Sequence, residues 1–196
     1  MPRTAQAQSA ARRDGILEAA TVVFLRYGFK KTSMDDLARA AGLSRQGLYL
    51  HFDTKEALFK AALHGLVSES RAALRAALAR DDLGVEERLV GAFEALHGQA
   101  FGAASSEHMN ELLEAATSLT GPLVAELEQE LTAGVVRILA SSGVSAAWKA
   151  VGVSARELAE NLSGTSVGVK HSVKTLAAYR ARMRTAVKIV ARGAHK

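Results

Sequence analysis

The chain has 196 residues, which is long enough for a substantial hydrophobic core in one large domain or two small ones. It contains no cysteine, and this excludes disulfides, a thiolate nucleophile and a cysteine-ligated metal. The sequence has no recognisable signal peptide and no run of about 18 uncharged apolar residues, so we expect a cytoplasmic protein without a membrane partner. With only two prolines, the composition favours an all-α fold.

The net charge of +5 is unevenly distributed along the chain. Residues 1–60 contain ten basic and six acidic residues, residues 61–169 contain seven and fourteen, and residues 170–196 contain eight and none. A polyanion would therefore be attracted to the N-terminal segment and repelled by the middle one. The basic C-terminal segment has three interpretations: a solvated helix face, charges paired with the acidic middle, or a second nucleic-acid patch.

The first part of the chain predicts an arm followed by a helix. Residues 1–9 show no helical periodicity and are expected to be disordered. Between Ala10 and Tyr27, apolar residues recur at helical spacing, and Gly28 is suited to end the helix. This helix is expected to brace the segment that follows it.

Residues 33–52 have the pattern of two short helices joined by a tight turn. Ser33 and Asp36 form a variant capping box at the start of the first helix. Gly42 suits the positive φ of a helix C-terminus, and Ser44 can cap a second helix. This is the spacing of a helix-turn-helix, with inward-facing residues Ala38, Leu48 and Phe52. Such a hairpin places its second helix in the major groove of DNA.

The second helix, expected from about Arg45 to Phe52, has polar side chains on its outer face. Arg45 can bind a guanine edge through two hydrogen bonds, and Gln46 can bind adenine in the same way. Gly47 would let the helix approach DNA closely, and the capping residue Ser44 lies at the same surface. The hairpin therefore predicts a DNA-reading surface.

With these motifs the chain resembles the tetracycline-repressor (TetR) family. The matching positions are Arg13-Asp14, Ile16-Leu17, Ala19-Ala20, Phe24, Gly28-Phe29, Thr32-Ser33-Met34, Ala38 to Ser44, Leu48-Tyr49, His51-Phe52 and Lys55-Glu56. The resemblance covers about residues 10–60 and implies contacts with backbone phosphates. The side chains that would make these contacts are Thr32, Ser33, Tyr49, His51 and Lys55.

The resemblance also implies an all-α architecture in which an N-terminal three-helix helix-turn-helix DNA-binding domain precedes a larger helical ligand-binding and dimerisation domain. The expected segments are an arm (1–9), the DNA-binding domain (10–57, with the helix-turn-helix at about 33–52), a connecting helix (58–79) and the C-terminal domain (80–196). Asp53 and Glu56 form the start signal of the connecting helix. A charged, glycine-ended break follows it.

The remaining sequence predicts further helices. They are expected over about 85–103, 107–118, from 122 onwards, from 154 onwards and over 174–192, with a loop at 141–153. Trp148 is expected to anchor that loop against the core, and Ser154 and Glu157 form a capping box. Three acidic residues have the spacing of a solvated helix face: Glu107, Glu111 and Glu114.

Six side chains suit an apolar pocket with a few polar groups, although each also suits an ordinary core position. They are Phe93, His97, Phe101, Met109, Leu113 and Trp148. By resemblance to the family, such a pocket would bind an unidentified small-molecule effector, and the last two helices would pair in a homodimer. Two reading helices related by a dyad predict a palindromic operator in double-stranded DNA. The family implies repression at the nucleoid, relieved by the effector.

No group of residues has the arrangement of a catalytic or metal site, so we expect neither an enzyme nor a bound cofactor. The six histidines include no i, i+4 metal-binding pair. Two alternatives to a ligand-released repressor stay open. One is a DNA-binding regulator that needs no ligand, and the other is a helical enzyme or protein-interaction module.

Overall fold

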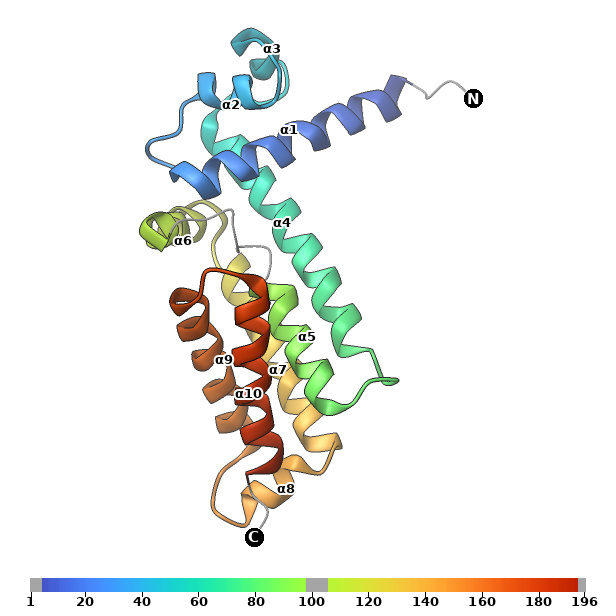
Figure 1. Ribbon diagram of the computed structural model, residues 1–196. Helices are drawn as coiled ribbons and strands as arrows, with labels where there is room; N and C mark the ends of the chain where they lie inside the picture. Colours follow the sequence, from blue (N-terminus) through green and yellow to red (C-terminus); the bar gives the residue numbers. More distant parts are fainter. Residues whose placement is uncertain (1–4, 98–105, 194–196) are drawn as a thin grey trace. The chain divides into compact units, whose positions relative to one another are not determined.

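The computed structural model describes residues 5–97 and 106–193, and the regular secondary structure of these residues is helical (Figure 1). The helices are α1 (Ala5–Tyr27), α2 (Met34–Ala40), α3 (Arg45–Tyr49), α4 (Lys55–Leu78), α5 (Val85–His97), α6 (Ser106–Thr120), α7 (Leu123–Ser141), α8 (Val144–Lys149), α9 (Ala155–Ser172) and α10 (Leu176–Arg192). The all-α prediction is confirmed. Within the described residues, no helix is both long enough and apolar enough to cross a membrane.

The helices form two compact units. The first unit combines residues 1–68 with 103–124, and so holds α1 to α3, the start of α4, and α6. The second combines residues 69–102 with 125–196, and holds the end of α4, α5 and α7 to α10. This division differs from the expected boundary at residues 80–84, because α4 is shared between the units and α6 belongs to the first.

Aromatic packing holds the first unit together. The rings of Phe24 in α1 and Phe59 in α4 meet edge to face with 5.0 Å between their centroids, and the ring of Phe29 lies 4.9 Å from that of Phe59. Leu37 of α2 and Leu48 of α3 are buried in the same cluster. Helix α6 adds two buried residues, Leu112 and Ala116.

The predicted capping boxes are present at two helix starts. At α2, the Ser33 hydroxyl accepts a hydrogen bond from the Asp36 N–H at 3.2 Å, and the Asp36 carboxylate accepts one from the Ser33 N–H at 3.0 Å. The Ser33 hydroxyl also donates a hydrogen bond to the Asp36 carboxylate at 2.6 Å, and this bond, together with the one from the Ser33 N–H, lowers the pKa of Asp36. Ser154 and Glu157 make the same pair of bonds at α9. Side-chain caps therefore start both helices where the sequence predicts them.

Other predicted bounds are wrong by a few residues. Helix α1 begins at Ala5, so it includes part of the segment expected to be an arm. Helix α3 ends at Tyr49 instead of Phe52. At the start of α4, Thr54 caps the helix in place of Asp53, because its hydroxyl accepts a hydrogen bond from an N–H three residues later at 3.0 Å. The end predicted for the helix from residue 85 lies outside the described residues.

The expected loop at 141–153 contains a short helix, α8. Trp148 of this helix donates a hydrogen bond from its indole N–H to the carbonyl oxygen of Val190 at 2.6 Å. The predicted role of Trp148 as an anchor is therefore confirmed. The helix itself escaped prediction because its six residues are too few to show a periodic pattern.

In the second unit, α5, α9 and α10 pack together (Figure 1), and α7 joins α5 through Glu128 and His97. The basic residues of α10 are partly paired with the acidic α5. Arg180 forms two hydrogen bonds with the carboxylate of Glu94. Arg192 lies 2.9 Å from the carboxylate of Glu86. For these residues, the interpretation of paired charges is confirmed.

Helix α7 approaches the end of α4 closely at Gly134. A Cβ atom added to Gly134 would overlap Cδ1 of Leu78 and lie 2.9 Å from its Cδ2. Gly134 is itself buried. A side chain at this position would therefore have to displace the end of Leu78.

We expect Gly134→Ala to stabilise the protein less than the matched control does, because the end of the half-buried Leu78 side chain must move to admit the added Cβ, which offsets part of the higher helix propensity of alanine. The matched control is Gly15→Ala in α1, where an added Cβ meets nothing within 4 Å. It should raise stability by about 0.5–1 kcal/mol. Chemical denaturation measures both values, and equal gains for the two variants would contradict tight packing at Gly134.

Candidate nucleic-acid interface

The α2–α3 hairpin has the predicted helix-turn-helix geometry. Gly42, in the turn, has a φ of +66°. The Ser44 hydroxyl accepts a hydrogen bond from the N–H of Gly47 at 3.0 Å and so starts α3. Leu48, on the inner side of α3, is fully buried. The turn, the cap and this buried side chain together fix which side of α3 faces outward.

The outer side of α3 is polar and exposed. Arg45, Gln46 and Tyr49 all lie on it. The Arg45 guanidinium is 3.2 Å from a carboxylate oxygen of Asp35 and 5.7 Å from the centroid of the Tyr49 ring. The Arg45 side chain is still 61% exposed, and such an exposed ion pair contributes about 1 kcal/mol or less. Arg45 can therefore leave Asp35 for another acceptor at little cost.

Two of the residues expected to contact phosphates are bonded within the protein. The Lys55 ammonium donates hydrogen bonds to the carbonyl oxygens of Phe29 and Thr32 at 2.9 and 3.0 Å, and lies 4.4 Å from the centroid of the Phe29 ring. Thr32 is buried, and its hydroxyl donates to the carbonyl oxygen of Gly28 at 2.6 Å. Both residues hold the loop between α1 and α2. Their contacts with phosphates stay predictions.

Helix α1 adds a cation that the sequence analysis did not assign to this surface. Arg13 donates a hydrogen bond to the carbonyl oxygen of His51 at 3.4 Å, and its guanidinium lies 4.3 Å from the centroid of the Phe52 ring. The side chain of His51 is half-buried. The family resemblance includes Arg13 but gives it no role, and its place beside His51 and Phe52 is set by the tertiary contact.

The described residues among those predicted to form an effector pocket are divided between the two units. Met109 and Leu113 lie on α6 in the first unit, and Leu113 is exposed. Phe93 and His97 are buried in the second unit, whereas Trp148 anchors α8 there. The remaining member, Phe101, lies outside the described residues. That these side chains line one effector pocket stays a prediction.

A buried hydrogen-bond network occupies the centre of the second unit. A ring nitrogen of His97 and the hydroxyl of Ser166 are 2.6 Å apart, and the hydroxyls of Ser166 and Tyr179 are also 2.6 Å apart. Tyr179 further donates to the carbonyl oxygen of Phe93 at 3.2 Å. The other ring nitrogen of His97 lies 3.4 Å from the Glu128 carboxylate. His97 is therefore part of a polar core that joins several helices.

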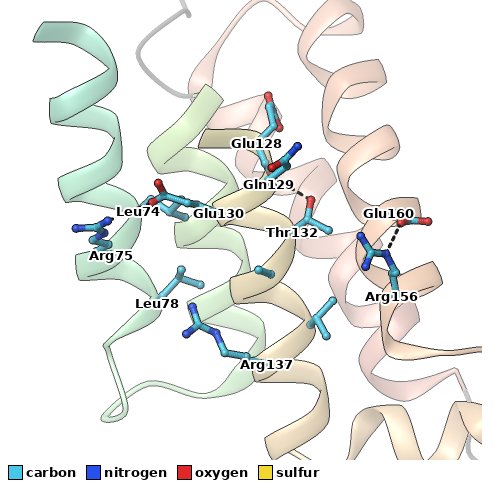
Figure 2. Close-up of a pocket in the computed structure, with 12 residues that line it drawn as sticks. Leu74, Arg75, Leu78, Glu128, Gln129, Glu130, Thr132, Arg137, Arg156 and Glu160 are labelled. Carbon is cyan, nitrogen blue, oxygen red and sulfur yellow. Dashed lines mark hydrogen bonds and ion pairs between the residues drawn. The ribbon is translucent and has the colours of Figure 1, made fainter. Parts of the chain in front are cut away.

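A groove of about 860 Å³ crosses the exposed side of α7, between α4 and α9 (Figure 2). Its apolar wall includes Leu74, Leu78 and Val136. The lining also includes Arg137, and two ion pairs: Arg75 with Glu130 at 3.5 Å and Arg156 with Glu160 at 3.0 Å. This volume is within the usual range of about 300–1,000 Å³ for small-molecule sites. None of the five described residues predicted to bind an effector lines the groove.

The first unit contains the segment that matches known proteins in sequence. Residues 16–62 match the model of the bacterial regulatory proteins of the tetR family. YfiR, an uncharacterized HTH-type transcriptional regulator of Bacillus subtilis, is 41% identical over 59 residues, which are 30% of this chain and 29% of that protein. The HTH-type transcriptional repressor ComR of Escherichia coli is 34% identical over 84 residues, or 43% and 40% of the two chains. The HTH-type transcriptional activator FasR of Mycolicibacterium smegmatis is 43% identical over 68 residues, or 33% and 31%.

The sequence matches thus span less than half the length of these curated relatives. The similarity of the fold to solved structures, in contrast, covers nearly all of this chain. A TetR-like transcriptional regulator from Rhodococcus sp. RHA1 superposes with a TM-score of 0.65 at 24% identity, covering 96% of this chain and 97% of the other. PfmR, a TetR family transcriptional regulator from Thermus thermophilus, also gives 0.65 at 23% identity, covering 92% and 99%. The architecture of both units is therefore that of solved TetR-family structures.

Helix α3 is exposed on its polar side and buried through Leu48 on the other. Within an all-α fold, this arrangement is that of a helix-turn-helix protein. Residues 16–62 match the model of the tetR family of bacterial regulatory proteins, and the fold of the chain is similar to that of solved TetR-family structures. The relatives named above are transcriptional regulators and not enzymes, which agrees with the expectation from the sequence.

The buried network makes a prediction about stability at high pH. Burial raises the pKa of Tyr179 from 10.0 to about 12. The unfolded chain therefore loses this proton at a lower pH than the folded chain. The stabilisation is complete below pH 10 and is lost as the pH rises towards 12, with a loss of about 1.4 kcal/mol by pH 11.

Urea denaturation at pH 8.5 and 11 tests this. Tyr179→Phe is expected to be less stable than wild type at pH 8.5 but to lose less stability between the two values. Tyr27→Phe, which changes an exposed tyrosine, should keep the wild-type pH dependence. The same loss in all three proteins would show that the phenol of Tyr179 titrates normally.

Proposed function

We propose that the protein is a homodimeric transcriptional repressor that binds a palindromic operator in double-stranded DNA and is released from it by a small-molecule effector. It would act in the cytoplasm, at the nucleoid. The observation that carries this proposal is the exposed polar side of α3, held outward by the burial of Leu48. The family's helix-turn-helix relatives support regulation as the role.

In this proposal, Arg45 specifies a base and other groups position the protein. Its guanidinium leaves Asp35 and binds the edge of a guanine through two hydrogen bonds, while Gln46 contacts an adenine. Ser33, Tyr49 and the N–H groups at helix starts contact phosphates and so set the orientation of α3. The exposure of Arg45 supports this exchange, because the guanidinium does not have to leave a buried site.

The proposed dimer forms through α9 and α10, which lie side by side (Figure 1). Their outer surfaces carry exposed apolar side chains, Val167 in α9 and Ile189 in α10, which are 44% and 62% exposed. Space is open above Gly164 and Gly168 of α9, so a second copy could approach its backbone. A two-fold axis would present two copies of α3 to successive major grooves about 34 Å apart.

The groove across α7 is the proposed effector site. Its apolar wall and charged rim suit a molecule with an apolar body and a polar group. Release requires that the effector bind the DNA-free conformation more tightly than the DNA-bound one. The relatives include the repressor ComR and the activator FasR, and a reporter gene placed behind the operator would distinguish repression from activation by this chain.

Selection of bound duplexes from a random pool tests DNA recognition. We expect a palindromic sequence, and for Arg45→Ala a loss of about 1–3 kcal/mol of discrimination at one base pair of each half-site. Asp35→Ala is the matched control. It removes the partner of Arg45 and a charge that repels phosphates, so it should strengthen binding by a factor of about two to five. No enriched sequence, or equal binding by all three proteins, would contradict the proposed function.

Operator release tests the effector site. Compounds that raise the melting temperature of the protein in a library screen are added to the preformed operator complex. We expect some of them to release the operator from wild type but not from Ala133→Phe, because the added ring fills the groove. Ala140→Phe adds the same ring to α7 outside the groove and should respond like wild type. Release of the operator from both variants would place the effector elsewhere.

A further inference from the structure

The loop from Gly28 to Ser33 determines where α2 begins, because Ser33 is the cap of that helix. On one side, Lys55 of α4 holds the loop through two of its carbonyl oxygens. An ammonium group can only donate, so it cannot bond the N–H groups of the loop. One of these groups, the N–H of Lys30, donates a hydrogen bond to a residue from a distant part of the chain.

That residue is Glu111 of α6. Its carboxylate accepts a hydrogen bond from the N–H of Lys30 at 2.5 Å, although 81 positions separate the two residues. The same carboxylate covers Gly28, where an added Cβ would lie 3.0 Å from Oε2. Gly28 also has a φ of +81°, so the position favours glycine for two reasons. The expectation that Glu111 lies on a solvated face is wrong, because α6 packs against α1 and half-buries it.

We propose that Glu111 is a positioning residue for DNA binding. By bonding Lys30, its carboxylate holds the loop in the conformation in which Ser33 caps α2, and it thereby orders the hairpin that presents α3. Residues 16–62, which match the family model, do not include this acceptor. The DNA-binding hairpin of this chain is therefore completed by α6. The inference rests on the proposed function, since it assigns a role in DNA binding.

The charge of Glu111 alone predicts the opposite effect on DNA binding. A carboxylate in the DNA-binding unit repels phosphates, so its removal would strengthen binding if only charge mattered. Loss of the hydrogen bond instead leaves the loop less ordered, and the protein must order it again on binding DNA. The sign of the change in affinity therefore separates the two roles.

The experiment compares three full-length variants on the selected operator. Glu111→Ala removes the acceptor and should weaken binding about fivefold, as expected for one lost hydrogen bond. Glu111→Gln keeps an amide oxygen that can accept from Lys30, and should bind like wild type or more tightly. Glu114→Ala removes the same charge from an exposed position on α6, and should not weaken binding.

Two further measurements separate positioning from general destabilisation. Hydrogen exchange of the Lys30 amide, measured without DNA, should be faster in Glu111→Ala than in wild type and close to wild type in Glu111→Gln. The base preference of binding should not change in any variant, because in this proposal Glu111 acts through the loop and not on the DNA.

The outcomes distinguish the two proposals. Equal or tighter binding by Glu111→Ala, or weakening that Glu111→Gln does not rescue, overturns the role of Glu111. Failure of the wild-type protein to bind any duplex contradicts the proposed function itself. Slow Lys30 exchange in Glu111→Ala would also overturn the inference, because the loop would then be ordered without the carboxylate.

Discussion

The burial of Leu48 is the contact on which the DNA-binding surface depends. Helix α3 has five residues, and a helix of this length is not stable through its own hydrogen bonds. It forms because Leu48 is buried in the hydrophobic cluster of the first unit and because Ser44 caps its first turn. The same burial turns Arg45 and Gln46 outward. A local hydrophobic contact thus creates the polar surface on the other side of the helix.

Some polar side chains near the hairpin form hydrogen bonds with the protein backbone, and others are exposed to solvent. Lys55, Thr32 and Glu111 bond the backbone of the loop between α1 and α2, where few main-chain partners exist. Arg45 has only an exposed ion pair to break before it binds another group. This division is physically reasonable, because rigid support lowers the entropy cost of binding while a weakly held cation stays available.

In the second unit, polar groups join the helices of the bundle. Tyr179 and Ser166 connect α10 and α9 to α5 through buried hydrogen bonds. At the surface, Arg180 and Arg192 pair with carboxylates of α5. These ion pairs account for part of the positive charge of the C-terminal segment. The positive charges of Arg180 and Arg192 are therefore explained by ion pairs within the protein and need no second nucleic-acid patch.

The sequence by itself determined the helical class, the position of the helix-turn-helix and the caps at Ser33, Ser44 and Ser154. These features depend on neighbours within four residues, so they are visible in the local pattern. Only the tertiary structure decided that α6 packs with the first unit, that Lys55 bonds a loop and that Glu111 lies against Gly28. Those contacts join residues far apart in the chain, and their partners are set by how the helices pack.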